Sequence, residues 1–130
     1  METAVQKIQH VIMLVDDEAA IRNLGHMLLT QAGYNVLLAK DSKEALRIFA
    51  DVAGRVDIVV CDVVMPGTSG IVLAKQLLSE VPGLKVVIMS GYSDEETHLR
   101  IKEVADHAVF LRKPFRADAL LGAIQTLITA

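Results

Sequence analysis

Cysteine and tryptophan are nearly absent from this chain of 130 residues, which has one cysteine and no tryptophan. The single cysteine, Cys61, excludes a disulfide within the chain and fits a reducing compartment. The four histidines lie far apart in the sequence, without the spacing of metal ligands. These absences argue against a disulfide-stapled domain and against a metal site built from histidine and cysteine.

An excess of positive charge is also lacking. There are 13 Lys and Arg against 16 Asp and Glu, a formal net charge of −3, so we expect no basic face for nucleic acid or an anionic membrane. The longest apolar stretches fall well short of the ~20 residues that span a bilayer. Residues 1–4 lack the basic-then-apolar pattern of a signal peptide. We therefore expect a soluble, cytoplasmic protein that contacts neither membrane nor nucleic acid directly.

What the chain does have is the composition of a folded domain. It is 52% hydrophobic and 22% charged, which is typical of a globular protein. The length suits one domain and is sufficient to bury a core without staples. No repeat, low-complexity tract or linker interrupts it. We predict a single domain over residues 1–130, with its core over about 10–128.

Five short apolar runs alternate with five stretches of helical periodicity. Runs such as Val11–Val15 are wholly apolar, as in strands that are buried on both faces of a parallel sheet. The alternation predicts an α/β fold with right-handed crossovers and helices on both faces of the sheet. The predicted strands are His10–Val15, Tyr34–Ala39, Asp57–Cys61, Leu84–Ser90 and His107–Leu111.

The segments between these strands predict amphipathic helices. In the first, Ile21, Leu24 and Leu28 share one face, which we expect to point inward. Asp41 and Glu44 form a capping-box-like pair at the start of the second. The predicted helices cover 19–32, a segment from 41, 70–80, a segment from Ser93 or Asp94, and a segment after Pro114.

Polar side chains follow four of the five predicted strands. In an open parallel sheet, ligands bind beyond the carboxyl ends of the strands. Asp16 and Asp17 follow the first strand, Asp62 follows the third, Ser90 ends the fourth, and Lys113 comes just after the fifth. Three converging carboxylates would repel one another without a cation, and their hard oxygens suit Mg²⁺.

The same residues could carry phosphoryl chemistry. A carboxylate can act as a nucleophile and form an aspartyl phosphate. The phosphoryl oxygens then need positive charge and hydrogen-bond donors, which Mg²⁺, Lys113, Ser90 and loop amides could supply. Each residue has an ordinary reading by itself: an acidic run after a strand can favour a helix N-terminus, and a lone Lys-Pro pair is most simply a surface loop.

Together these motifs resemble the receiver domain of two-component response regulators. The matching pieces are residues 14–18 (LVDDE), 61–70 (CDVVMPGTSG), 89–92 (MSGY) and 110–115 (FLRKPF). The resemblance runs nearly end to end, from about His10 to Ile128. It implies the flavodoxin-like (βα)5 three-layer sandwich, with a parallel five-stranded sheet of order 2-1-3-4-5.

The resemblance also implies which residues form the site. Asp62 is expected to be the phosphoacceptor. Mg²⁺, for which Mn²⁺ could substitute, would be held by Asp17, Asp62 and the main-chain carbonyl of Val64, with Asp16 helping directly or through water. No further cofactor is implied.

Three other residues have expected roles from the same resemblance. Lys113 would pair with the phosphoryl group, and its bond to Pro114 is expected to be cis. Ser90 would serve as the hydroxyl of the switch and Phe110 as its aromatic partner. Phosphorylation would then repack the surface of the fourth helix, fifth strand and fifth helix, where a partner binds. Phe110 lacks the hydroxyl of a tyrosine, so it could turn by packing alone.

The implied function is phosphorelay signal transduction. The donor would be the phosphohistidine of a histidine kinase or histidine phosphotransfer domain, or a small phosphodonor, and the output an unidentified downstream protein. The chain would catalyse only its own phosphorylation and dephosphorylation, as a monomer or weak dimer. It could be a stand-alone regulator or the receiver of a hybrid histidine kinase, and only in that second case would histidine kinase activity (EC 2.7.13.3) apply.

Three rival functions remain to be compared. An aspartate-nucleophile phosphatase of the haloacid dehalogenase type would need an acid two residues after Asp62, where this chain has Val64. A flavodoxin would need a hydroxyl- and glycine-rich phosphate loop after the first strand, where Asp16, Asp17 and Glu18 would repel the FMN phosphate. A pseudo-receiver, folded but never phosphorylated, is the remaining alternative, and would act as a protein-interaction module.

Overall fold

Five parallel strands form one sheet in the order β2-β1-β3-β4-β5 in the computed structural model, which is the order that the family resemblance implied. The structure describes residues 9–65, 67–91, 99, 102, 104 and 108–129. The strands are β1 (Val11–Val15), β2 (Asn35–Ala39), β3 (Ile58–Asp62), β4 (Lys85–Ser90) and β5 (Ala108–Arg112).

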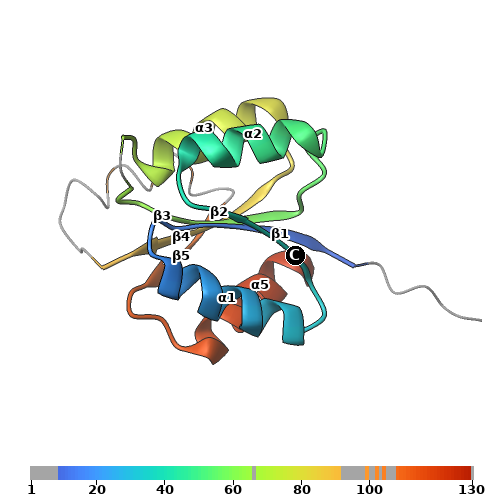
Figure 1. Cartoon of the computed structure of the whole chain (residues 1–130), viewed down its shortest axis with the longest axis vertical. Coiled ribbons are helices and arrows are strands. Elements are labelled where there is room, and N and C mark those ends of the chain that lie inside the picture. Colours follow the sequence, from blue (N-terminus) through green and yellow to red (C-terminus); the bar gives the residue numbers. More distant parts are fainter. Residues whose placement is uncertain are drawn as a thin grey trace, which may run out of the picture.

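Helices cover both faces of this sheet, so the molecule has three layers (Figure 1). Helices α2 and α3 lie on one face, and α1 and α5 on the other. The described helices are α1 (Ala19–Gln31), α2 (Ser42–Asp51), α3 (Gly70–Glu80) and α5 (Ala117–Thr129). The helix predicted from Ser93 or Asp94 lies outside the described residues.

The apolar side chains of the strands form two hydrophobic cores, one on each face of the sheet. Along β1, Met13 and Val15 pack on the side of α2 and α3, whereas Ile12 and Leu14 pack on the side of α1 and α5. All four are fully buried or nearly so. This alternation explains the uninterrupted apolar sequence of the central strands, because both faces of the sheet are covered. Each fully buried aliphatic side chain stabilises the fold by about 1.5–3 kcal/mol.

The inward face expected for α1 is right only in part, because Ile21 and Leu28 are half-buried but Leu24 is not. The residues it buries are Gly25 and Leu29, and Leu24 is 42% exposed. Gly25 lies so close to the Leu14 side chain that a Cβ there would collide with it. The helix therefore approaches β1 through its glycine, with Leu29 buried and Ile21 and Leu28 half-buried, while Leu24 lies outside this inward face.

The start of α2 follows the prediction in part. The Asp41 carboxylate accepts a hydrogen bond from the amide of Glu44 at 2.8 Å, as an N-cap does. The Glu44 carboxylate, however, accepts from the amide of Lys40 at 2.9 Å, one residue before the amide that a capping box would use. Among the described residues, no helix is both long enough and apolar enough to span a membrane.

Candidate functional site

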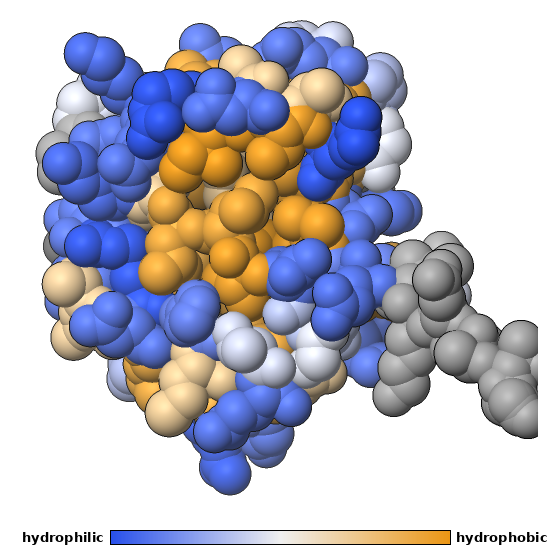
Figure 2. All heavy atoms as spheres, turned by 45° about the vertical axis from the view of Figure 1, so that its right-hand side comes forward, coloured by the Kyte–Doolittle hydropathy of each residue, from blue (hydrophilic) through white to orange (hydrophobic). Residues whose placement is uncertain are grey.

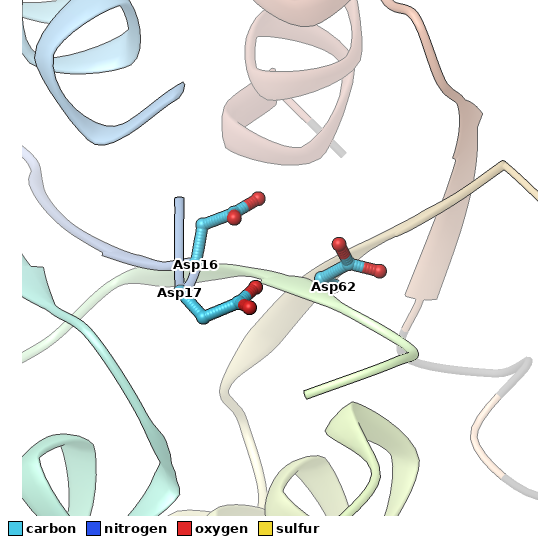
Figure 3. Close-up of side chains that lie close together, drawn as sticks. All are labelled: Asp16, Asp17 and Asp62. Atoms are coloured by element: carbon cyan, nitrogen blue, oxygen red, sulfur yellow. The ribbon is translucent and has the colours of Figure 1, made fainter. Parts of the chain in front are cut away.

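Three aspartates meet at the carboxyl ends of β1 and β3. The two strands pair in register with Val15 opposite Cys61, so the next residues, Asp16 and Asp62, lie at the same level. One carboxylate oxygen from each of Asp16, Asp17 and Asp62 lies within 4.8 Å of the others. Figure 3 shows the three side chains reaching into the same space from the two strand ends. Asp16 and Asp62 are buried, and Asp17 is exposed.

Lys113 places its ammonium between the two buried acids. Its Nζ lies 2.8 Å from Oδ2 of Asp16 and 2.5 Å from Oδ2 of Asp62. The more exposed Glu18 carboxylate is 3.8 Å away. The amide of Lys113 donates to the carbonyl of Ser90 at 2.9 Å, which continues the β4–β5 ladder and fixes where the lysine leaves the sheet.

The charge of Lys113 is stabilised by this position. Burial lowers the pKa of its ammonium, but hydrogen bonds to Asp16 and Asp62, together with their negative charge, outweigh that cost and raise the pKa above its ordinary value. The lysine therefore carries a full positive charge at neutral pH. That charge compensates part of the repulsion among the three aspartates.

The remaining oxygens of the buried acids accept main-chain hydrogen bonds. Oδ1 of Asp62 accepts from the amide of Val64 at 3.1 Å, and Oδ1 of Asp16 accepts from the amide of Glu18 at 2.9 Å. Glu18 is the N-cap residue of α1 and makes no side-chain capping bond. Of the three aspartates in the cluster, Asp16 is the one whose carboxylate accepts a main-chain hydrogen bond near the start of α1, so a capping role does not account for the cluster.

The donor set fits a hard divalent cation. Octahedral Mg²⁺ binds oxygen at ~2.1 Å, which places ligand oxygens roughly 3–4 Å apart. Carboxylate oxygens within 4.8 Å need only small side-chain movements to reach that spacing. Exposed Asp17 offers a carboxylate without loss of a buried contact, whereas Asp62 already holds Lys113 and the Val64 amide. The predicted role of the Val64 carbonyl stays a prediction, and the Val64 residue is 55% exposed.

The two predicted switch residues lie on neighbouring strands. Ser90 is buried at the end of β4 and is opposite Arg112, while Phe110 on β5 is opposite Ile88. Residues opposite one another share a face, and side chains alternate along a strand. Ser90 and Phe110 therefore point to the same face of the sheet, and Phe110 is level with the residue two positions before Ser90. Phe110 is 37% exposed.

Two positions near the site were not anticipated from the sequence. An Nη1 donor of Arg22 bonds the main-chain oxygen of Asp16 at 2.7 Å, which holds the peptide between Asp16 and Asp17. Gly70 begins α3 against the main chain of Asp62. The sequence features that could have indicated these contacts are an arginine one helical turn after Glu18 and a glycine at a predicted helix start.

The other sequence expectations at this edge have clear outcomes. The bond between Lys113 and Pro114 is cis, as predicted. Cys61 is fully buried, and its Sγ lies 3.6 Å from the carbonyl oxygen of Gly70, so it packs in the core. Tyr92, the last residue of the matching segment 89–92, lies outside the described residues.

Comparison with known proteins identifies the family. The model of the response regulator receiver domain matches residues 12–125. The chain is 36% identical over 117 residues to the sensor kinase CckA of Brucella abortus, covering 90% of this chain and 12% of that protein. It is 35% identical over 118 residues to the transcriptional regulatory protein FixJ of Bradyrhizobium diazoefficiens, covering 90% of this chain and 56% of FixJ.

A solved structure agrees with these relatives. The receiver domain of a response regulator from Clostridium thermocellum superposes with a TM-score of 0.82 at 33% identity, over 92% of this chain and 94% of that one. The chain thus spans only part of its curated relatives but nearly the whole of this isolated receiver. These matches support a role in phosphorelay signalling and give no support to the pseudo-receiver alternative. This protein belongs to the response regulator receiver domain family of two-component systems.

Proposed function

We propose that this domain accepts a phosphoryl group on Asp62 in a Mg²⁺-dependent reaction. The observation that carries the proposal is the ammonium of Lys113 between Asp16 and Asp62, within a cluster of three acids. An oxygen of Asp62 forms the new bond to phosphorus as the P–N bond of a donor phosphohistidine breaks, and the imidazole leaves with the electron pair. With acetyl phosphate, a P–O bond breaks and acetate leaves.

The residues of the chain divide the work by position. Asp16, Asp17, Asp62 and the Val64 carbonyl hold Mg²⁺, or Mn²⁺ in its place. When bound, the ion neutralises charge on the phosphoryl oxygens. Lys113 must give up its contact with Asp62 Oδ2 for that oxygen to react, and its ammonium then lies next to the phosphoryl group. Oriented cations of this kind stabilise developing negative charge.

Ser90 and Phe110 respond to the phosphoryl group in this proposal. The Ser90 hydroxyl donates to a phosphoryl oxygen and moves toward it. Phe110 lies on the same face of the neighbouring strand, level with Ile88 two residues before Ser90, so it can turn into the space that Ser90 leaves. Because the ring has no hydroxyl, packing alone selects its position. The surface beside β5 changes as a result, and a downstream protein reads that change.

The relatives of this domain support a context for the proposed reaction. A histidine kinase or histidine phosphotransfer domain supplies the phosphoryl group, and the domain resides in the cytoplasm. It acts as one folding unit with a core over about residues 10–128. Matches to the sensor kinase CckA and the regulator FixJ favour either a receiver within a larger kinase or a regulator; histidine kinase activity belongs only to the former.

The test is the intact mass of the protein after incubation with acetyl phosphate, with Mg²⁺ and with EDTA. We expect one added phosphoryl group, which requires Mg²⁺ and is lost in Asp62→Asn. The matched control is Asp118→Asn, an exposed acid at the start of α5, which should be phosphorylated like the wild type.

Each outcome has a clear meaning. Phosphorylation that persists in Asp62→Asn would place the acceptor elsewhere and refute the assignment. If the folded wild type gains no mass from acetyl phosphate, transfer from a phosphorylated histidine kinase decides, and failure of that transfer as well would overturn the proposal.

A further inference from the structure

The outer edge of β2 is open. Within the described part of the chain, β2 pairs with β1 alone and ends the sheet. Its sequence, Asn35–Ala39, contains no charged residue and no proline. Charged side chains and proline commonly protect an edge strand from pairing with another chain. This edge therefore keeps its capacity to add a strand.

The hydrogen bonds at the two ends of β2 show which of its main-chain groups face outward. The amide of Asn35 donates to His10 at 3.0 Å, and the carbonyl of Ala39 accepts from Asp16 at 3.1 Å. In a parallel ladder, alternate residues direct both their N–H and C=O groups to the same neighbour. Asn35, Leu37 and Ala39 thus bond to β1, and the main-chain groups of Val36 and Leu38 point away from the sheet.

An apolar surface lies beside this edge. A groove of about 510 Å³ runs between the start of β2 and the end of α2, and its lining includes Val11, Leu37 and Val52. On this side of the molecule, Figure 2 shows a broad hydrophobic area bordered by hydrophilic residues. An apolar centre with a polar border is the usual composition of a protein interface.

The charges on α2 are arranged to suit a second copy of the same surface. Asp51 lines the groove at the start of β2, and Lys43 lies with Lys40 at the other end of the strand. Lys43 and Asp51 are eight residues apart, so they share one stripe of the helix. Between them, Arg47 is compensated within its own copy by Glu44 at 3.9 Å and Asp51 at 3.4 Å.

We propose that two copies of this chain associate through antiparallel pairing of their β2 strands about a two-fold axis at Leu37. Val36 of each copy is then opposite Leu38 of the other, and each pair exchanges two main-chain hydrogen bonds. The two Leu37 side chains meet at the axis and cover the apolar grooves. The two α2 helices run antiparallel, which brings Lys43 of each copy to Asp51 of the other.

This arrangement is independent of the phosphoryl site. The acidic cluster lies at the carboxyl ends of β1 and β3, whereas the pairing edge is the side of β2 and the groove lies at its amino end. A dimer of this kind leaves the aspartate cluster accessible in both copies. The interaction is therefore tested on unphosphorylated protein, separately from the proposed chemistry.

The first measurement is sedimentation over a wide concentration range for the wild type, Lys43→Glu, Asp51→Lys and the double variant. Each single charge reversal turns two attractive pairs into repulsive ones, which should raise the dimer Kd roughly tenfold. The double variant exchanges the charges and should restore dimerisation. Asp118→Lys, a charge reversal on exposed α5, is the control and should dimerise like the wild type.

Hydrogen exchange on the wild type then locates the interface. The amides of Val36 and Leu38 should become more protected as the protein concentration rises. The amide of Leu37 is the internal control, because it already bonds to β1. A chain that stays monomeric at every concentration overturns the proposal. So does a dimer in which Val36 and Leu38 exchange at unchanged rates, or in which the double variant is not restored.

Discussion

Gly70 begins α3 directly against the main-chain carbonyl of Asp62, so closely that a Cβ on Gly70 would overlap that oxygen. The amide of Gly70 also donates to the carbonyl of Val63 at 2.9 Å. These contacts close the loop between β3 and α3 onto its own ends. The position of the proposed phosphoacceptor therefore depends on the absence of a side chain eight residues later.

Substitution of Gly70 by alanine tests this dependence. We expect Gly70→Ala to lower the free energy of unfolding by about 1–3 kcal/mol, because the main chain must shift to relieve the overlap. Phosphorylation by acetyl phosphate should slow as Asp62 moves. Urea denaturation and phosphorylation rates measure the two effects.

Gly122→Ala is the matched control for this change. Gly122 lies within α5, and a Cβ there would meet nothing within 4 Å. Alanine should therefore stabilise the helix by about 0.5–1 kcal/mol. If Gly70→Ala behaved like Gly122→Ala in both measurements, the close approach to Asp62 would have no consequence for the site.

Much of the site was predictable because parallel strands deliver their carboxyl ends to one edge. That rule alone brings Asp16, Asp17 and Asp62 together. It does not place Lys113 between Asp16 and Asp62, because the lysine extends back over the sheet from a loop after the edge strand β5. The family resemblance placed Lys113 beside the phosphoryl group, but its ion pairs with Asp62 and Asp16, which are 51 and 97 positions away, were not predicted.

The errors at helices have local physical causes. The α1 prediction counted large apolar residues and gave Gly25 no weight, although the close approach of α1 to Leu14 passes through that glycine. The N-cap of α3 was also missed: the Ser69 hydroxyl accepts from the amide of Val72 at 3.2 Å. Ser69 has no acid three residues later, so the capping-box pattern did not reveal it.

Loss of the exposed carboxylate of Asp17 should abolish most Mg²⁺ binding. In the wild type, Mg²⁺ at a hundred times its Kd would stabilise the fold by about 2.7 kcal/mol. Asp17→Asn should reduce that gain strongly and leave the metal-free protein as stable as the wild type or more so, because a repelling charge is gone. Thermal unfolding with and without Mg²⁺ measures both quantities.

The control for Asp17→Asn is Glu80→Gln, which removes the same charge at the end of α3, away from the site. It should keep the full stabilisation by Mg²⁺. An unchanged Mg²⁺ effect in Asp17→Asn would show that this carboxylate is not a ligand.

Removal of the Lys113 ammonium should separate metal binding from the response to phosphorylation. Lys113→Ala leaves Oδ2 of buried Asp16 without its charged partner, so we expect a loss of about 1–3 kcal/mol of stability. Mg²⁺ should bind at least as tightly as in the wild type, because a positive charge has left the cluster. Calorimetric titration measures the affinity, and NMR follows the response of β5 to phosphorylation.

Lys113→Met is the second variant, because it keeps most of the side-chain volume while removing the charge. It should reproduce the tight Mg²⁺ binding of Lys113→Ala with a smaller loss of packing. Weaker Mg²⁺ binding in both variants would contradict the view that the ammonium competes with the cation. Phosphorylation shifts at β5 of wild-type size would contradict its role in the response.

The reactivity of Cys61 should report on local opening of the structure around the carboxyl end of β3, next to Asp62. Burial, and secondarily the charge of Asp62, raise the pKa of the Cys61 thiol to about 12. The thiolate is the reactive form, so the folded protein should resist thiol reagents at pH 8, whereas unfolded protein in guanidinium should react once per chain. Reaction in the native state then requires opening of the structure between β3 and α3.

Ligands that stabilise the site should therefore slow this reaction. If Mg²⁺ binds at Asp62, as proposed, adding it should lower the population of the open form and slow Cys61 labelling by the same factor, about tenfold for each 1.4 kcal/mol of added stability. The Asp17→Asn variant should lose that protection while remaining slow in labelling without the metal. Rapid labelling of the folded wild type would show that the structure between β3 and α3 opens far more readily than the packing of Cys61 implies. Equal protection by Mg²⁺ in Asp17→Asn would place the ion elsewhere.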